Sequence, residues 1–319
     1  MKIFNSYIFC YFFYLTINNS NGFMLNLNNN KMIHNKMIHN KMIHNKMIHN
    51  KMIHNHNEKN INIINVPFDR GANVIGSRYA FNHLKEPLSN ILNINKIKTI
   101  STKYTHLSTI FNLAYVSVYN SLINNNFPLT IGGDHSVAIS SVAAVNTYCF
   151  NKNKTLGILW FDAHADFNTM LSSPSGNIHG VPVALLCGHT LPLLQMGKTL
   201  NTNQFAYYGL RDIDSAEFIR FQDYSMLHLL NKEEIESWVS NFDALHISFD
   251  IDCLDPSIIK SVNTPVNNGL LLNNVKEAFN VIKNSNKLVS MDLVEYNPLK
   301  DVNKEDLNII INLMNYLYD

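Results

Sequence analysis

Short runs of apolar and often β-branched residues alternate with longer amphipathic segments from residue 61 onward. Strands that are covered on both faces carry nearly continuous hydrophobic sequence, so these runs predict buried strands of a parallel sheet. The runs lie at 61–68, 128–133, 155–162, 205–210, 244–250 and 287–296.

The segments between these runs place leucine, isoleucine and valine at helical spacing, which predicts helices. They lie at 107–124, 135–148, 180–188, 231–240, 271–284 and 303–318. Regular alternation of strands and helices predicts the α/β fold class, with a mostly parallel, doubly wound sheet and helices on both faces. In such sheets ligands bind at the carboxyl ends of the strands, so polar residues at those ends are the first candidates for function.

The first 57 residues follow a different pattern. Residues 7–17 form an apolar, aromatic run after Lys2, too short for a membrane span but typical of a secretory signal, so 1–22 is predicted to be a signal-like hydrophobic leader. Five copies of KMIHN occupy 31–55, and a period of five fits neither helix nor strand. We therefore expect 23–57 to be low-complexity and disordered, and 58–319 to form the folded domain.

Localisation depends on that leader. If it is an inert terminus, we expect a cytoplasmic protein, and if it carries an address, we expect an organelle or the secretory route. No part of the sequence predicts a transmembrane span.

Charge is distributed unevenly along the 319 residues. The whole chain has 25 Lys and Arg against 24 Asp and Glu, but the first 57 residues hold six lysines and no acid, which leaves a net charge of −5 for the remainder. An acidic domain argues against nucleic acid as a partner. Four cysteines without a CxxC pair support neither a zinc ribbon nor a disulfide scaffold, and we interpret them as small buried hydrophobes.

Three predicted strands run directly into acidic and histidine residues: DHS at 134–136, DAHAD at 162–166 and DID at 250–252. Alternation with alanine or isoleucine projects the polar side chains to one side of an extended chain. In isolation each motif would be typical of helix caps and turns. Together they supply the candidate metal ligands His135, Asp162, His164, Asp166, Asp250 and Asp252.

Two imidazoles and four carboxylates without a thiolate suit a hard divalent cation such as Mn²⁺. Four carboxylates in one pocket repel one another, and two ions would compensate them better than one. A pair of ions can share a bridging water and lower its pKa, which predicts metal-assisted hydrolysis.

These motifs resemble those of the ureohydrolases, and specifically of arginase. The resemblance rests on IGGDHS (131–136), DAHADFN (162–168), SGNIHG (175–180) and SFDIDCLDP (248–256), supported by VPFDRGAN (66–73), YGLRDID (208–214), NTP (263–265) and MDLVEYNP (291–298). It implies a three-layer α/β/α sandwich and two Mn²⁺ per subunit. One ion would be held by His135, Asp162, Asp166 and Asp250, and the other by His164, Asp162, Asp250 and Asp252, so that Asp162 and Asp250 bridge.

The resemblance also implies a reaction. A metal-bridging hydroxide would attack the guanidinium carbon of L-arginine, giving L-ornithine and urea. Asp166 would pass a proton to the leaving amine, His179 would shuttle protons to solvent, and Glu295 would contact the guanidinium group.

Substrate choice depends on the amino-acid end. Asn168, Ser173 and Ser175 match positions that meet the carboxylate, Asp214 (with Asp212 nearby) matches the amino-group site, and Thr264 matches a hydroxyl that faces the substrate. The retained SGNIHG motif ranks L-arginine above agmatine and formiminoglutamate.

Two other classes of protein stay open on the sequence: a non-catalytic scaffold on a decayed arginase fold, and an amide deacetylase, which shares the fold but uses one zinc. The resemblance to arginase also implies a longer C-terminal tail, which commonly wraps a neighbouring subunit in a homotrimer. The chain ends 24 residues after Glu295, so we expect a trimer only if it assembles without that tail. Asn263 stands where a glycine is frequent, which would matter if the position needed a positive φ.

Overall fold

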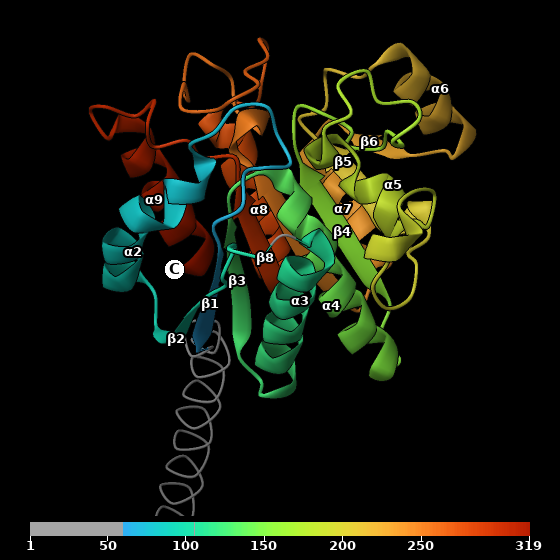
Figure 1. Cartoon of the computed structure of the whole chain (residues 1–319). Coiled ribbons are helices and arrows are strands. Elements are labelled where there is room, and N and C mark those ends of the chain that lie inside the picture. The colour runs from blue at the N-terminus through green and yellow to red at the C-terminus, as the bar shows by residue number, and fades with distance from the viewer. Residues whose placement is uncertain (1–59, 105) are drawn as a thin grey trace, which may run out of the picture. The chain divides into compact units, whose positions relative to one another are not determined.

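The computed structural model describes residues 60–104 and 106–319. Eight parallel strands form one sheet in the order β2-β1-β3-β8-β7-β4-β5-β6 (Figure 1). The predictions for the leader and for the KMIHN repeats lie outside the described residues.

All six predicted strands are present, with ends that differ by a few residues at most. They are β1 (Ile61–Val66), β3 (Phe127–Gly132), β4 (Leu156–Phe161), β5 (Phe205–Tyr208), β7 (Ala244–Asp250) and β8 (Leu288–Val294). Two strands were missed, β2 (Ile94–Thr99) and β6 (Leu227–Leu229), which are the two edges of the sheet. Most of their side chains are partly or fully exposed, so they lack the apolar sequence of a buried strand.

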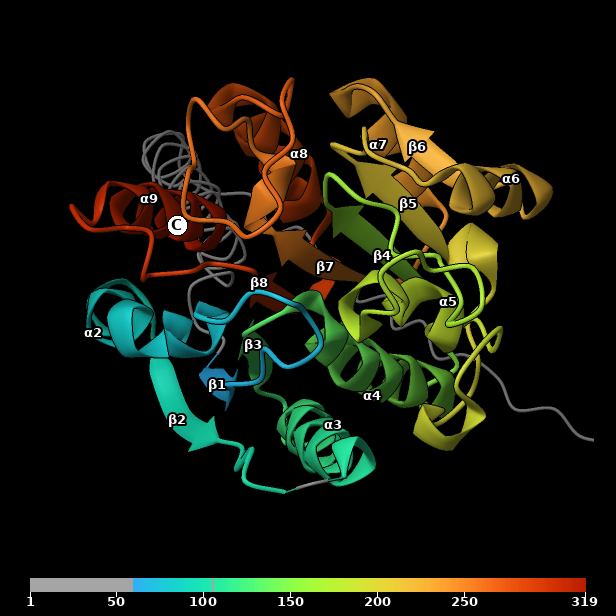
Figure 2. The same ribbon diagram turned by 45° about the horizontal axis from the view of Figure 1, so that its top comes forward.

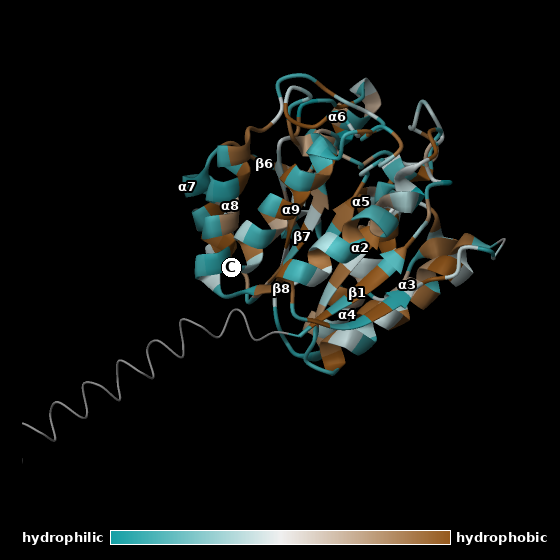
Figure 3. Cartoon of the chain, turned by 90° about the vertical axis from the view of Figure 1, so that its left-hand side faces the viewer, coloured by the Kyte–Doolittle hydropathy of each residue, from teal (hydrophilic) through white to brown (hydrophobic). Residues whose placement is uncertain are grey.

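Helices cover both faces of the sheet, which confirms the three-layer α/β/α architecture (Figure 2). One layer contains α3 (Leu107–Ile123), α4 (Ala138–Asn151) and α5 (Pro182–Leu186), and the other contains α2 (Ala80–Ile91), α7 (Lys232–Ser240), α8 (Leu272–Ser285) and α9 (Glu305–Tyr318). Figure 3 shows hydrophobic strands between helices that alternate in hydropathy.

The sequence pattern missed α2 and α6 (Ser215–Asp223). Pro87 lies inside α2, where a proline ordinarily argues against a helix. The predicted helix at 135–148 begins instead with the 3₁₀ turn η3 (His135–Val137), and α4 continues from it.

Two hydrophobic clusters fill the spaces between the sheet and its helical layers. Trp160 on β4 and Phe249 on β7 are among the largest fully buried side chains and pack on opposite faces of the sheet. Among the described helices, none is long and apolar enough to cross a membrane.

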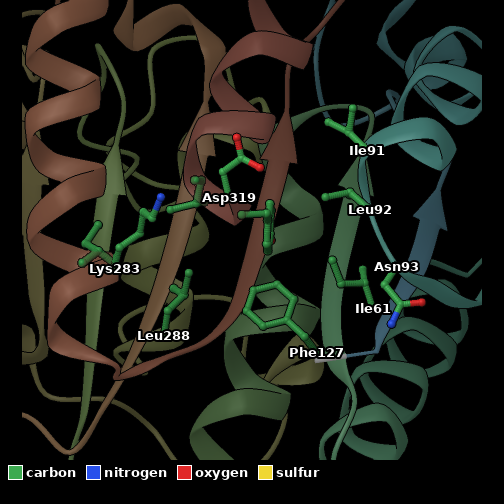
Figure 4. A pocket seen from close by; sticks show the side chains of 11 residues that line it. Ile61, Ile91, Leu92, Asn93, Phe127, Lys283, Leu288 and Asp319 are labelled. Carbon is green, nitrogen blue, oxygen red and sulfur yellow. The ribbon is translucent and has the colours of Figure 1, made fainter. Parts of the chain in front are cut away.

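An apolar pocket of about 230 Å³ lies where several strands begin (Figure 4). Ile61, Phe127 and Leu288, the first residues of β1, β3 and β8, line this pocket together with Leu317 of α9. Its lining contains no histidine or cysteine. The side chains suited to metal binding lie at the opposite side of the sheet, at the carboxyl ends of the strands.

Candidate metal centre and active site

Four neighbouring strands at the middle of the sheet, β3, β8, β7 and β4, deliver the candidate residues from their carboxyl ends. A pocket of about 140 Å³ at this edge is lined by every residue that the sequence singled out. These are His135, Asp162, His164, Asp166, Asn168, Ser173, Ser175, His179, Asp214, Asp250, Asp252, Thr264 and Glu295. Gly180, Asp212 and Glu217 complete the lining.

His135 is the centre of a first group of potential ligands. Its Nδ1 atom lies 2.9 Å from Asp162 Oδ2, 3.2 Å from Asp166 Oδ2 and 3.2 Å from Asp250 Oδ2. All four side chains are buried. Ligand atoms about 3 Å apart are the spacing expected when each lies about 2.1 Å from one octahedral cation.

His164 is the centre of a second group. Its Nδ1 atom lies 3.1 Å from Asp252 Oδ2 and 3.3 Å from Asp162 Oδ1. Asp162 therefore offers one carboxylate oxygen to each group, as a bridging ligand would. Asp250 Oδ1 accepts a hydrogen bond from the Asp252 backbone N–H, and its close histidine contact is with His135.

Neighbouring side chains hold these candidate ligands in place. His135 Nε2 lies 2.9 Å from Ser248 Oγ, and the imidazole stacks on the Trp160 ring at 4.2 Å. Trp160 Nε1 donates to Asp162 Oδ2 at 2.9 Å. Such contacts fix the orientation of the imidazole ring and of the carboxylate. Because Ser248 occupies Nε2, Nδ1 is the His135 nitrogen that can bind a metal ion.

The electrostatics of the group also suit cations. Burial and the charge of neighbouring aspartates raise the pKa values of Asp166, Asp250 and Asp252. His135 Nδ1 and Asp166 Oδ2 are buried and have no hydrogen-bond partner in the described residues. Buried nitrogen and oxygen atoms that lie close together without hydrogen-bond partners fit the coordination of divalent metal ions.

Glu295 and His179 form a carboxylate–imidazole pair beside the His135 group. Glu295 Oε1 accepts from the His135 backbone N–H at 3.0 Å and lies 3.3 Å from His179 Nδ1. Burial disfavours a charged imidazole, but Glu295 outweighs it and raises the pKa of His179 to about 9. Glu295 Oε2 is buried without a partner in the described residues, which leaves it able to accept a ligand N–H.

Two of the candidate residues have unusual backbone geometry. Asp166 has φ 49° and Glu295 has φ 63°, values that non-glycine residues rarely adopt. Strained residues of this kind persist when the surrounding structure fixes them, and they concentrate at functional sites. Asn263 has no positive φ, so a glycine is not required there.

The outer part of the pocket carries the residues expected at the amino-acid end. Asn168 Nδ2 donates to Asp214 Oδ2 at 3.0 Å, and the Ser173 and Ser175 hydroxyls lie 3.5 Å apart. Thr264 Oγ1 donates to Asp252 Oδ2 at 3.1 Å, which connects this region to the second group of ligands.

Arg211 is a supporting residue that the sequence did not reveal. Its guanidinium donates to six backbone carbonyl groups, those of Gly209, Asp252, Cys253, Leu254, Val266 and Asn267. It joins the end of β5, the segment after β7 and the loop that follows Thr264. No sequence pattern could have indicated this role, because every residue carries a backbone carbonyl group that an arginine can bind.

Asp134 and Glu217 were also missed as supporting residues. Asp134 accepts from the backbone N–H groups of Gly71 and Ser136, and so caps the turn that presents His135. Glu217 accepts from the Phe167 N–H at 2.7 Å, directly after Asp166. The Asp-x-x-Glu spacing of 214–217 at the start of α6 was a capping signal that could have indicated Glu217.

A family model described as the arginase family matches residues 59–317. The chain belongs to the arginase family. An arginase from Staphylococcus aureus is 33% identical over 246 residues, which cover 72% of this chain and 80% of that protein. The crystal structure of Entamoeba histolytica arginase in complex with L-ornithine has a TM-score of 0.73 at 28% identity and covers 82% of this chain and 98% of that one.

Formimidoylglutamase from Bacillus subtilis has a TM-score of 0.67 at 17% identity, covers 82% of this chain and 86% of its own, and shares the fold. Membership in the arginase family makes this chain a hydrolase. The arginase family is metal-dependent, with manganese as its characteristic metal, and acts on small-molecule substrates.

Proposed function

We propose that this protein hydrolyses the guanidinium group of L-arginine to L-ornithine and urea, using two Mn²⁺ per chain. The observation that carries the proposal is the sharing of Asp162 between the His135 and His164 groups, beside the His179–Glu295 pair in one pocket.

The residues around His135 and His164 would hold the ions as the sequence motifs imply, with Asp250 as the second bridging ligand. When bound, two divalent cations neutralise the carboxylates and lower the pKa of water, which supplies a nucleophile at neutral pH. This chain provides an acidic ligand set, buried except for the partly exposed His164, that matches that charge.

The remaining catalytic steps belong to side chains of the pocket. Glu295 has a free, buried carboxylate oxygen that can accept guanidinium N–H groups and orient the carbon for attack. Asp166 would take a proton from the attacking water and transfer it to the leaving amine. His179, with its raised pKa, can hold a proton for exchange with solvent.

Selection of L-arginine over agmatine would depend on the outer pocket. Asn168, Ser173 and Ser175 offer neutral donors for a carboxylate, and Asp214 offers an anion for the ammonium group. Agmatine lacks the carboxylate and would leave those donors without a partner.

The test measures urea release by the full-length, manganese-loaded protein from equal concentrations of L-arginine and agmatine. We expect a clear preference for L-arginine and no urea from Asp166→Ala. A preference for agmatine would overturn the substrate assignment. Urea release by Asp166→Ala at the wild-type rate would overturn the proton-transfer role.

A further inference from the structure

A polar cleft of about 470 Å³ lies between the edge strand β2, the first half of β1 and helix α3. Figure 2 shows β2 outermost in the sheet, with α3 alongside. Asn62 at the start of β1 lines the cleft, whereas the metal-ligand candidates follow the opposite ends of the strands. The cleft is therefore separate from the catalytic pocket.

The floor of this cleft is polar where a helix packed on a sheet ordinarily presents apolar side chains. Ser117, Asn120 and Ser121 of α3 and the C-cap residue Asn124 recur at helical spacing, and all four line the cleft. Asn62 is only 9% exposed, and its Nδ2 atom donates to Ser121 Oγ at 3.0 Å. Hydroxyl and amide groups are thus built into the base of the cleft.

Two lysines give the cleft a positive charge. Lys96 and Lys98 alternate on β2, so they project from the same face of the strand, about 6.6 Å apart along the backbone. Within the described residues neither forms an ion pair. From 87 to 133 the sequence contains three lysines and no acid, in a domain that is otherwise acidic.

We propose that this cleft binds a small organic phosphate. Lys96 and Lys98 supply the charge that a phosphate group requires, and the Asn120 side-chain amide can donate hydrogen bonds to its oxygens. The Ser117 and Ser121 hydroxyls donate to carbonyl groups of α3, so they serve as acceptors for hydroxyl groups of the ligand. The absence of a carboxylate from the lining favours an anion over a cation or an amine.

The experiment titrates glycerol 3-phosphate into the full-length, metal-loaded protein by isothermal calorimetry, with glycerol as the uncharged comparison. Wild type is expected to bind glycerol 3-phosphate saturably and glycerol not at all. The double variant Lys96→Ala/Lys98→Ala should bind at least about ten-fold more weakly, since two charge-assisted contacts are lost. Both lysines are exposed, so folding should be unaffected.

The matched control is Lys103→Ala, which removes the same charge from an exposed position outside the cleft lining. It should bind like wild type. A second variant, Asn120→Phe, leaves both lysines in place but fills the cleft, and it should also weaken binding. Absence of saturable binding to wild type, unchanged binding in the double lysine variant, or an equal loss in Lys103→Ala would each overturn the proposal.

Discussion

Arg211 Nη2 lies 2.8 Å from the backbone carbonyl oxygen of Asp252. The side chain of one residue thus fixes the main chain of a proposed metal ligand. Because the same guanidinium also bonds to Gly209 and to Val266, it sets the spacing of three segments that border the pocket.

Replacing Arg211 with lysine keeps the charge but removes the planar set of donors that reaches these carbonyl groups. We expect manganese affinity to fall by about 10 to 100-fold, as is typical for residues that orient metal ligands. The measurement is the free Mn²⁺ signal in electron paramagnetic resonance titrations. Arg70→Lys is the matched control, since Arg70 also donates to two carbonyl groups but lies outside the pocket lining. Equal affinity in Arg211→Lys and wild type would show that Arg211 does not position the ligands.

Asp162→Asn should affect both groups of ligands, because each carboxylate oxygen of Asp162 faces a different histidine. We expect metal stoichiometry below one ion per chain, with affinity reduced beyond the roughly 100-fold seen for outer residues. Asp252→Asn, by contrast, should retain one ion, since Asp252 lies in the His164 group alone. The exposed Asp223→Asn should bind like wild type. Loss of the same number of ions in the Asp162 and Asp252 variants would contradict the sharing.

Asn168→Ala tests substrate selection. Its amide donates to Asp214, so the variant removes a proposed carboxylate donor and also loosens the proposed ammonium site. We expect kcat/KM for L-arginine to fall by about ten-fold or more, the effect of one hydrogen bond to a charged group, with a smaller change for agmatine. Steady-state urea release from both substrates gives the ratio. An equal fall for both would assign Asn168 a structural role.

Glu217 predicts a pH effect on stability. Burial raises its pKa from 4.5 to about 7 in the folded protein, so the folded state binds more protons than the unfolded chain in that range. The free energy of unfolding should therefore decrease as the pH rises from 4.5 to about 7. For wild type, the contribution of Glu217 to this decrease should be on the order of 3 kcal/mol across the range. Glu217→Gln should lack this contribution. Urea unfolding of chelator-treated protein at several pH values measures both, and parallel curves would refute the prediction.

Much of the fold follows from the sequence because the inner strands are buried on both faces. β3 and β7 are fully buried, and their apolar runs were recognised nearly to the residue. The edge strand β2 carries Lys96 and Lys98 and was missed, since its exposed face imposes no apolar pattern.

The location of the candidate site could also be predicted from the sequence, for a related reason. Its acidic and histidine side chains stand at or directly after the ends of strands, where an apolar run stops, and so the sequence pattern marks their location. Arg211 lies in a loop and acts on backbone carbonyl groups, which leave no trace in side-chain identity. The strand order, which brings Glu295 beside His135, also depends on long-range pairing that local patterns do not specify.

That strand order has a consequence for folding. β3 and β4 follow one another along the chain, yet β8 and β7 lie between them in the sheet. His135 and Asp162 are therefore held at contact distance by a framework that includes residues 244–294, which are synthesised after both of them. A nascent chain that ends before β7 lacks Asp250 and Asp252 as well as the strands that space the others, so manganese binding at the proposed centre would report that the four central strands, β3, β8, β7 and β4, have assembled.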